Sequence, residues 1–282
     1  MAPNVAVPIP PIVKVPNLSV RSPAPAVSAT PTVIKFRGLE KSTLFWTQIR
    51  PAMAAISPNS TLDLKFEPFA WPFAHERRSE IDAHFAERRR QKPKIWNGRI
   101  LLARTANFAD GRLSSSYFET DFASFLAWRD WGFPDSDVFN GFGMGALRAA
   151  DGAFVMGEMA GHTANAGRIY FPAGTPDLDD LKGGAVDIAG SVVREVEEET
   201  GLTPADYRLE PHWDCVVTSA SVAMMRLLHV EMPGEDIRAR IEANLAAQTE
   251  PELAAIHLVR HVGDFTATMP HFVTAFVAQH FA

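Results

Sequence analysis

One short stretch, residues 194–202, constrains this chain more than any other, because it reads REVEEETGL and places four glutamates within nine residues. Aliphatic residues recur every four positions from Ile188 to Val196, which predicts an amphipathic helix. Asp187 is suited to cap the N-terminus of that helix, and Gly201 stands where helices commonly end in a left-handed residue. We therefore expect a helix over about residues 188–200.

The glutamates fall on different sides of this predicted helix, which turns by about 100° per residue. Measured from Val192 at the centre of the apolar stripe, Glu199 lies about 20° away. Glu195 and Glu198 lie about 60° and about 120° away on the same side, whereas Glu197 points toward water. Acidic runs are usually solvated, but a carboxylate over an apolar face loses its hydration, and like charges four residues apart repel. A hard divalent cation such as Mg²⁺, which prefers carboxylate and water oxygens, would relieve both costs.

Residues 194–202 resemble the second half of the Nudix hydrolase signature, G-x5-E-x7-R-E-U-x-E-E-x-G-U, in which U is a bulky aliphatic residue, and match it at every specified position. The first half departs from the signature, since Val186 stands at the glutamate position and Asp180 at the opening glycine position. We interpret residues 178–186 as a lengthened loop. On that interpretation Gly174 is the opening glycine.

The rest of the resemblance concerns the segments that flank this departure. Residues 171–177 are similar to the family's loop before the helix, and Asp187 would stand near the place of the missing glutamate. The glycine alternation in residues 141–148 would belong to a hairpin like the one that opens the Nudix fold. Its glycines are then explained by strand packing rather than by dinucleotide binding, because no phosphate-cradling helix follows.

The resemblance implies an α/β (α+β) fold, a Nudix-like α/β/α sandwich around a mixed sheet. It also implies Mg²⁺-dependent hydrolysis of the diphosphate bond in a nucleoside diphosphate linked to another moiety (NDP-X), with an NDP-sugar as one candidate and Mn²⁺ as a substitute metal. The products would be a nucleoside monophosphate and phosphorylated X. The alternative is a catalytically inactive Nudix-fold module that binds or senses a nucleotide. The enzyme is favoured because the signature glutamates are present.

The same resemblance suggests residue roles. Glu198 and Glu199 would bind the metal, Glu195 would bind metal or act as general base, and Arg194 would hold Glu195 in orientation. A further metal ligand or base would come from a late loop, where Glu250 and Glu252 are the candidates, although loop carboxylates are usually only solvated. In the polar loop before the catalytic segment, His162 and Arg168 are candidates for contact with a phosphate or base. Gly174 completes the candidate substrate-binding residues.

Two groups of residues outside the signature receive simpler interpretations. The basic residues Arg88, Arg89, Arg90, Lys92 and Lys94 are better explained as a solvated helix end than as phosphate ligands. The tryptophans Trp96, Trp128 and Trp131 are expected in the core rather than in a platform for base stacking.

Three segments are expected along the chain: a disordered tail rich in Pro and Val (residues 1–35), a small mixed α/β domain (36–138) and a Nudix hydrolase domain (139–282). Strands are expected at residues 61–66, 99–104, 113–119, 141–148 and 153–159, with two or three more in 206–232, and helices at 74–91, 121–131, 234–248 and 270–281. The run at residues 253–262 is apolar.

The net charge of −6 and pI near 5.9 give no electrostatic footprint for nucleic acid or an anionic membrane. No apolar run approaches the roughly 18 residues of a membrane span. The single cysteine, Cys215, fits a reducing compartment and is expected to be a buried, inert thiol in a strand. We expect a cytoplasmic protein whose partner is a small-molecule nucleotide, with a homodimer as one candidate assembly.

Overall fold

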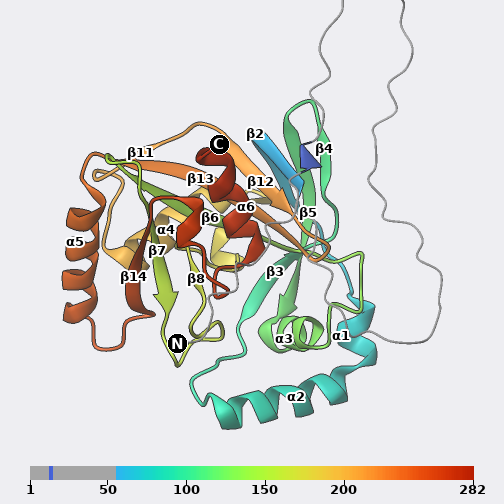
Figure 1. Cartoon of the computed structure of the whole chain (residues 1–282). Helices are drawn as coiled ribbons and strands as arrows, with labels where there is room; N and C mark the ends of the chain where they lie inside the picture. Colours follow the sequence, from blue (N-terminus) through green and yellow to red (C-terminus); the bar gives the residue numbers. More distant parts are fainter. Residues whose placement is uncertain (1–12, 15–54) are drawn as a thin grey trace, which may run out of the picture.

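The computed structural model describes residues 13–14 and 55–282 (Figure 1). The tail predicted for residues 1–35 lies outside the described residues except for β1 (Val13–Lys14), which pairs in parallel with the start of β2 (Ala55–Phe66). In the described part of the chain, none of the helices combines the length and hydrophobicity needed to span a bilayer.

The described residues form a mixed sheet whose longest path runs β14-β7-β6-β13-β12-β2-β10-β9. Its centre is the parallel pair β6–β13, and most other neighbours are antiparallel. The remaining strands are β3 (Arg99–Ala103), β4 (Asn107–Ala109), β5 (Arg112–Asp121), β6 (Asn140–Ala149), β7 (Phe154–Met159), β8 (Ile169–Tyr170), β9 (Leu181–Lys182), β10 (Ala185–Val186), β11 (Arg208–Leu209), β12 (Trp213–Val217), β13 (Ser221–Val230) and β14 (Leu253–Val259). The mixed α/β fold class expected from the sequence is confirmed.

The helices follow the expected positions with one difference. They are α1 (Pro72–Glu76), α2 (Arg78–Gln91), α3 (Phe122–Asp130), α4 (Ile188–Thr200), α5 (Gly234–Ala247) and α6 (His271–His280). The single helix predicted for residues 74–91 is two helices, separated at Arg77, whose φ of −107° and ψ of 19° leave the helical region. The first of them begins earlier than predicted because Pro72, which has no N–H to satisfy, occupies a first-turn position.

The segment interpreted as a lengthened loop, residues 178–186, has regular structure. It contains the short 3₁₀ helix η1 (Leu178–Asp180) and the hairpin β9–β10. The hairpin turns through Gly183 and Gly184, whose φ angles of 59° and 82° are readily adopted by glycine. The departure from the signature is therefore a structured insertion.

The long strand β2 joins the two halves of the chain. Its first half pairs antiparallel with β12, and its second half pairs in parallel with β5 and contacts β10. A separate apolar cluster lies between α2, α3 and the strands β3 and β5, and includes Ile81, Leu102, Phe118, Leu126 and Trp128. The domain division near residue 138 stays a prediction.

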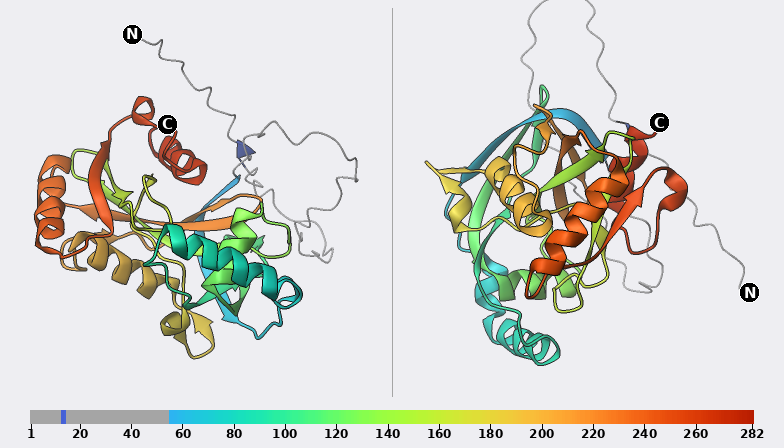
Figure 2. Two further views of the ribbon diagram at one scale, coloured as in Figure 1. Left: turned by 90° about the horizontal axis from the view of Figure 1, so that it is seen from below. Right: turned by 90° about the vertical axis from the view of Figure 1, so that its left-hand side faces the viewer.

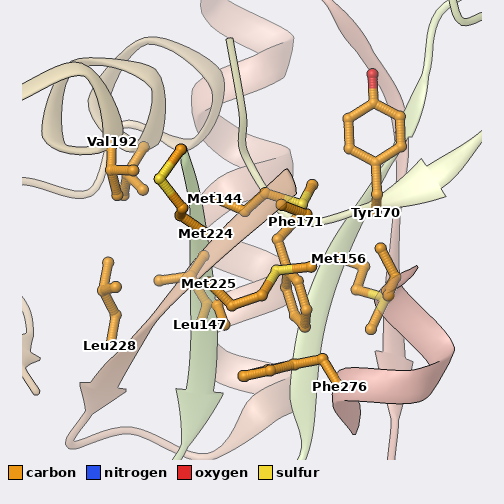
Figure 3. Close-up of a cluster of buried hydrophobic side chains, with 14 of the residues drawn as sticks. Met144, Leu147, Met156, Tyr170, Phe171, Val192, Met224, Met225, Leu228 and Phe276 are labelled. Carbon is orange, nitrogen blue, oxygen red and sulfur yellow. The ribbon is translucent and has the colours of Figure 1, made fainter. Parts of the chain in front are cut away.

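Helices α4 and α6 cover opposite faces of the sheet, as the left view of Figure 2 shows. A Cβ at Gly143 would lie 2.5 Å from Val192 Cγ2, so the small residue lets α4 approach β6 closely. On the other face, Phe154 packs edge to face against Phe276 of α6, with 5.9 Å between the two ring centroids. Figure 3 shows Val192 and Phe276 at opposite ends of the same apolar cluster. Gly143 therefore serves the packing of β6 against α4.

Buried and exposed side chains match some of the sequence interpretations. Cys215 is buried in β12, and burial raises the pKa of its thiol to about 12, as expected of an inert cysteine. Trp128 is buried, and Trp131 packs against the same cluster. The prediction was wrong for Trp96, which is 80% exposed because it lies in the linker between α2 and β3 and not in either element.

Candidate active site

Helix α4 has the boundaries that the sequence predicts. The Asp187 side chain caps it by accepting a hydrogen bond from the Gly190 N–H at 2.9 Å. At the other end Gly201 adopts a left-handed φ of 71°, and its N–H donates to the Glu197 carbonyl at 2.8 Å. Both ends are thus fixed by local contacts, which holds the intervening glutamates in one register.

The glutamates of α4 differ sharply in exposure, in the order expected from the helical arc. Glu199 is 4% exposed, and the Glu195 side chain is 17% exposed. Glu197 and Glu198 are exposed. Glu198 therefore borders the buried pair from the solvent side, and Glu197 points away from it as predicted.

The buried pair faces the loop that follows β8. The Ala173 N–H donates to Glu199 Oε1 at 3.3 Å. Gly174 lies directly against the Glu195 carboxylate, so that a Cβ at this position would overlap its oxygens. The loop thus supplies one backbone donor and one close approach that only glycine permits. Gly174 was predicted as a substrate-binding residue, and its observed contact is with Glu195.

The electrostatics of the pair disfavour two negative charges. Burial raises the pKa of Glu195 to about 7, with added repulsion from Glu198 and Glu252 and partial relief from Arg194. Burial also raises the pKa of Glu199 well above its ordinary value, and repulsion from Glu195 raises it further. A positive charge brought to this pair would therefore be strongly favoured.

Arg194 has a second partner that sequence reasoning missed. Its guanidinium donates to both carboxylate oxygens of Asp180, at 2.8 and 3.4 Å, and reaches Glu195 Oε1 at 3.4 Å. Asp180 is 2% exposed and sits at the end of η1. Arg194 therefore touches Glu195 as predicted, but it is itself held by the buried Asp180.

Asp180 is thus the buried acidic residue that holds the Arg194 side chain. Asp187 caps α4, as the sequence predicts, and forms an ion pair with Lys182. Its part in place of the missing glutamate stays a prediction. The signal for Asp180 was present in the sequence, since this carboxylate occupies the opening glycine position of the signature.

The two late-loop candidates separate in space. Glu252 is exposed, and its charge raises the pKa of both Glu195 and Glu199, which places it beside the buried pair. Glu250 forms an ion pair with Lys94, and this partner, with a smaller contribution from His162, lowers the pKa of the Glu250 carboxyl. Glu252 therefore stays with the carboxylate group, whereas Glu250 belongs to its rim together with His162.

Tyr170 is a neighbour of the carboxylates that the sequence did not single out. Burial raises the pKa of its hydroxyl, and the charges of Glu199 and Glu252 act in the same direction. The hydroxyl accepts a hydrogen bond from Asn165 Nδ2 at 3.1 Å, and the Asn165 side-chain oxygen accepts one from Arg129 at 3.3 Å. This chain of contacts connects α3 to the carboxylate group.

One further sequence candidate, Arg168, lies at the surface. The Arg168 side chain is exposed, and its backbone carbonyl accepts a hydrogen bond from the Met159 N–H at 2.9 Å.

A surface cavity of about 600 Å³ lies at the N-terminal end of α4 and is lined by residues of β2, the β9–β10 hairpin and Trp213. None of the predicted site residues lines this cavity. The carboxylate group is therefore separate from this cavity.

The chemistry of the carboxylate group suits a hard divalent cation, since Glu195, Glu198, Glu199 and Glu252 offer carboxylate oxygens. In the described part of the chain, however, no group of three or more His, Cys, Asp or Glu side chains converges closely enough to form a ready metal cluster. Glu195 and Glu199 thus provide a buried, repelling pair, and Glu198 and Glu252 border it from the solvent side. A cation here would have to draw the exposed carboxylates inward.

Comparison with known proteins finds likeness only at the level of structure. No protein-family model and no curated protein matches the chain. Similar solved structures include a Nudix hydrolase from M. Smegmatis (12% identity, 49% of this chain and 80% of that one, TM-score 0.32) and the MutT protein from Methanosarcina mazei Go1 (16%, 50% and 92%, 0.31). A bifunctional NMN adenylyltransferase/ADP ribose pyrophosphatase from Francisella tularensis also matches (10%, 55% and 44%, 0.32). At such TM-scores these likenesses carry no weight for the activity.

Proposed function

We propose that this protein is a metal-dependent hydrolase that cleaves the diphosphate bond of a nucleoside diphosphate linked to another moiety, with an NDP-sugar as one candidate substrate. The observation that carries the proposal is the pair Glu195 and Glu199 on α4, of which Glu199 is buried and Glu195 partly buried, facing the Ala173–Gly174 loop. Folding places two carboxylates where neither is well hydrated, so ionising both costs free energy unless a cation joins them. Structural glutamates are rarely buried in this way.

The residues would divide the work as follows. Glu199 and Glu198 would hold Mg²⁺, with Mn²⁺ as a substitute, and Glu195 would either join them or accept the proton of the attacking water. Bound there, the cation would offset charge on the diphosphate and lower the pKa of a water molecule. Arg194, clamped by Asp180, would fix the orientation of Glu195.

The binding residues proposed around this centre come from the rim. Glu252 is a candidate for a further ligand because its charge acts on both buried glutamates. His162 and Arg168 are candidates for contact with a phosphate or a base, and Glu250 is less suited to bind metal because Lys94 already neutralises it. Hydrolysis would give a nucleoside monophosphate and phosphorylated X.

One observation favours a second candidate, a nucleotide-binding or sensing module without turnover. The described residues contain no preformed cluster of three metal-ligating side chains, as a module that has lost its metal site would show. Both functions predict that a nucleotide binds, but only the enzyme cleaves it. A measurement of cleavage therefore distinguishes them, whereas a measurement of binding does not.

The experiment that tests the proposal measures phosphate-ester release from NDP-sugars, ADP-ribose, dinucleoside polyphosphates, coenzyme A and dNTPs, each with Mg²⁺ and with a chelator. We expect turnover of at least one substrate with Mg²⁺, none with the chelator, and products that identify the diphosphate bond as the one cleaved. Binding of these compounds without cleavage of any would support the sensing module and overturn the enzyme.

A further inference from the structure

Trp96 stands out among the large apolar side chains of the structure because it is 80% exposed. It lies in the linker of residues 92–98, which joins α2 to β3 (Figure 1). An indole left in water forgoes the free energy that burial would give, about 25 cal/mol per Å² of apolar surface. A solvent-exposed tryptophan on the rim of a site is therefore a candidate contact for a ligand.

The linker is fastened to the molecule on both sides of Trp96. Before it, the Lys92 ammonium donates to the Thr163 carbonyl, and Lys94 forms an ion pair with Glu250. After it, the Gly98 carbonyl accepts a hydrogen bond from the Phe122 N–H at 2.9 Å, and Leu101 of β3 donates to the Pro176 carbonyl at 2.7 Å. The two lysines hold the linker against two loops, and the strand that follows it contacts a third, so the position of the linker is set by the fold.

The same three loops carry the groups around the buried carboxylates. The first supplies Asn165, which binds Tyr170 beside Glu199 and Glu252. The second supplies Glu252 itself. The third begins with the Ala173–Gly174 contacts to the glutamate pair. The linker and the strand that follows it therefore contact the three loops that carry these groups.

Chain length limits how far Trp96 can lie from this rim. It is two residues from Lys94, so their Cα atoms are at most about 7 Å apart. Glu250, the partner of Lys94, is likewise two residues from Glu252. The Lys94–Glu250 ion pair thus ties the segment that carries Trp96 to the segment that carries Glu252.

Gly98 fixes the orientation of the indole. A Cβ on this residue would lie 2.5 Å from Trp96 Cζ3 and 2.8 Å from Cε3, so the six-membered ring rests against the Gly98 backbone. Gly98 is itself buried and held by the Phe122 N–H, which donates to its carbonyl at 2.9 Å. One side of the ring is therefore supported, while the side chain remains open to solvent.

We propose that Trp96 determines substrate specificity by stacking on the nucleobase of the nucleotide whose phosphates occupy the carboxylate site. The proposal rests on the proposed function for the location of the phosphates, but not on turnover. Stacking on an aromatic side chain accepts any base, because every base has a π face. Trp96 would select for nucleotides over diphosphates that lack a base.

The test measures equilibrium binding of ADP and of inorganic pyrophosphate, each with Mg²⁺, to the full chain by calorimetry. Trp96→Ala removes the ring, whereas Gly98→Ala leaves it in the chain but pushes it off its support. Val262→Ala, which trims another exposed apolar side chain, is the matched control. We expect the first two variants to weaken ADP binding roughly 5- to 150-fold and to leave pyrophosphate binding unchanged, with the control like the wild type.

Several results would overturn the proposal. One is an unchanged ADP affinity in Trp96→Ala, and another is an equal loss of ADP and pyrophosphate binding. A third is that Trp96→Ala weakens a dimer in sedimentation without changing the ADP affinity, which would assign the indole to a contact with a second copy of the chain. The proposed function fails separately, by absence of turnover. A variant effect on ADP binding in a protein that cleaves nothing would support Trp96 and reject the enzyme.

Discussion

Replacing Glu195 by glutamine is expected to stabilise the protein at pH 8 in the presence of a chelator. Burial raises the pKa of this carboxyl from 4.5 to about 7, with further repulsion from Glu198 and Glu252. Because a change of one in pKa corresponds to about 1.4 kcal/mol, ionised Glu195 destabilises the folded state by about 3 kcal/mol. The neutral amide of Glu195→Gln avoids that cost while keeping nearly the same shape.

The pH dependence has a definite sign. The pKa of Glu195 is higher in the folded state than in the unfolded state. The contribution of its protonated form to the stability of the protein is therefore fully present below about pH 4.5 and is lost as pH rises through about 7. The advantage of Glu195→Gln over wild type should therefore be about 3 kcal/mol at pH 8 and close to zero at pH 4.5.

Urea denaturation followed by circular dichroism at the two pH values measures this difference. Glu197→Gln is the matched control, since Glu197 is exposed on the same helix and its replacement should change stability by less than about 0.5 kcal/mol. Adding Mg²⁺ at 100 times its dissociation constant should stabilise the wild type by about 2.7 kcal/mol, and the variant by less. A variant that is less stable than wild type at pH 8 in chelator would refute the reasoning.

Two further predictions concern the neighbours of the buried pair. Asp180→Asn should cost about 3 kcal/mol of unfolding free energy in the same urea assay, because it leaves the Arg194 guanidinium without its buried carboxylate, and a cost below about 1 kcal/mol would show that the pair is dispensable. Gly174→Ala should lower kcat at least about 10-fold in the turnover assay while circular dichroism stays native, because its methyl group would displace the Glu195 carboxylate. Gly161→Ala, where a methyl group meets nothing within 4 Å, is the control, and equal kcat in the two variants would argue against a role for the Gly174 contact.

The parts of the site that the sequence predicts are those set by local rules. The apolar period, the capping residue Asp187 and the left-handed Gly201 define α4 within the chain itself, and the helical arc then decides that Glu199 is buried and Glu197 exposed. Strand alternation likewise located most of the sheet. Such features depend on neighbours within a few residues, which a single sequence displays.

The parts that were missed depend on contacts between distant segments. Asp180 lies 14 residues before Arg194 in the chain, and the β9–β10 hairpin lies between them. No periodicity in the sequence predicts this hairpin. Tyr170 received no role from the sequence, because only the fold brings its hydroxyl under the influence of the Glu199 and Glu252 charges. Trp96 was expected in the core by residue type alone, but it lies in the linker between α2 and β3 and is exposed. These outcomes follow from tertiary packing, which residue type constrains weakly.

The central claim is that the buried face of α4 is a metal-dependent catalytic site, and the most direct test compares Glu199→Gln with Glu197→Gln on the best substrate of the panel. We expect Glu199→Gln to lower kcat at least about 100-fold with the fold intact, and Glu197→Gln to match the wild type. Retention of wild-type turnover by Glu199→Gln, or equal losses in the two variants, would contradict the account.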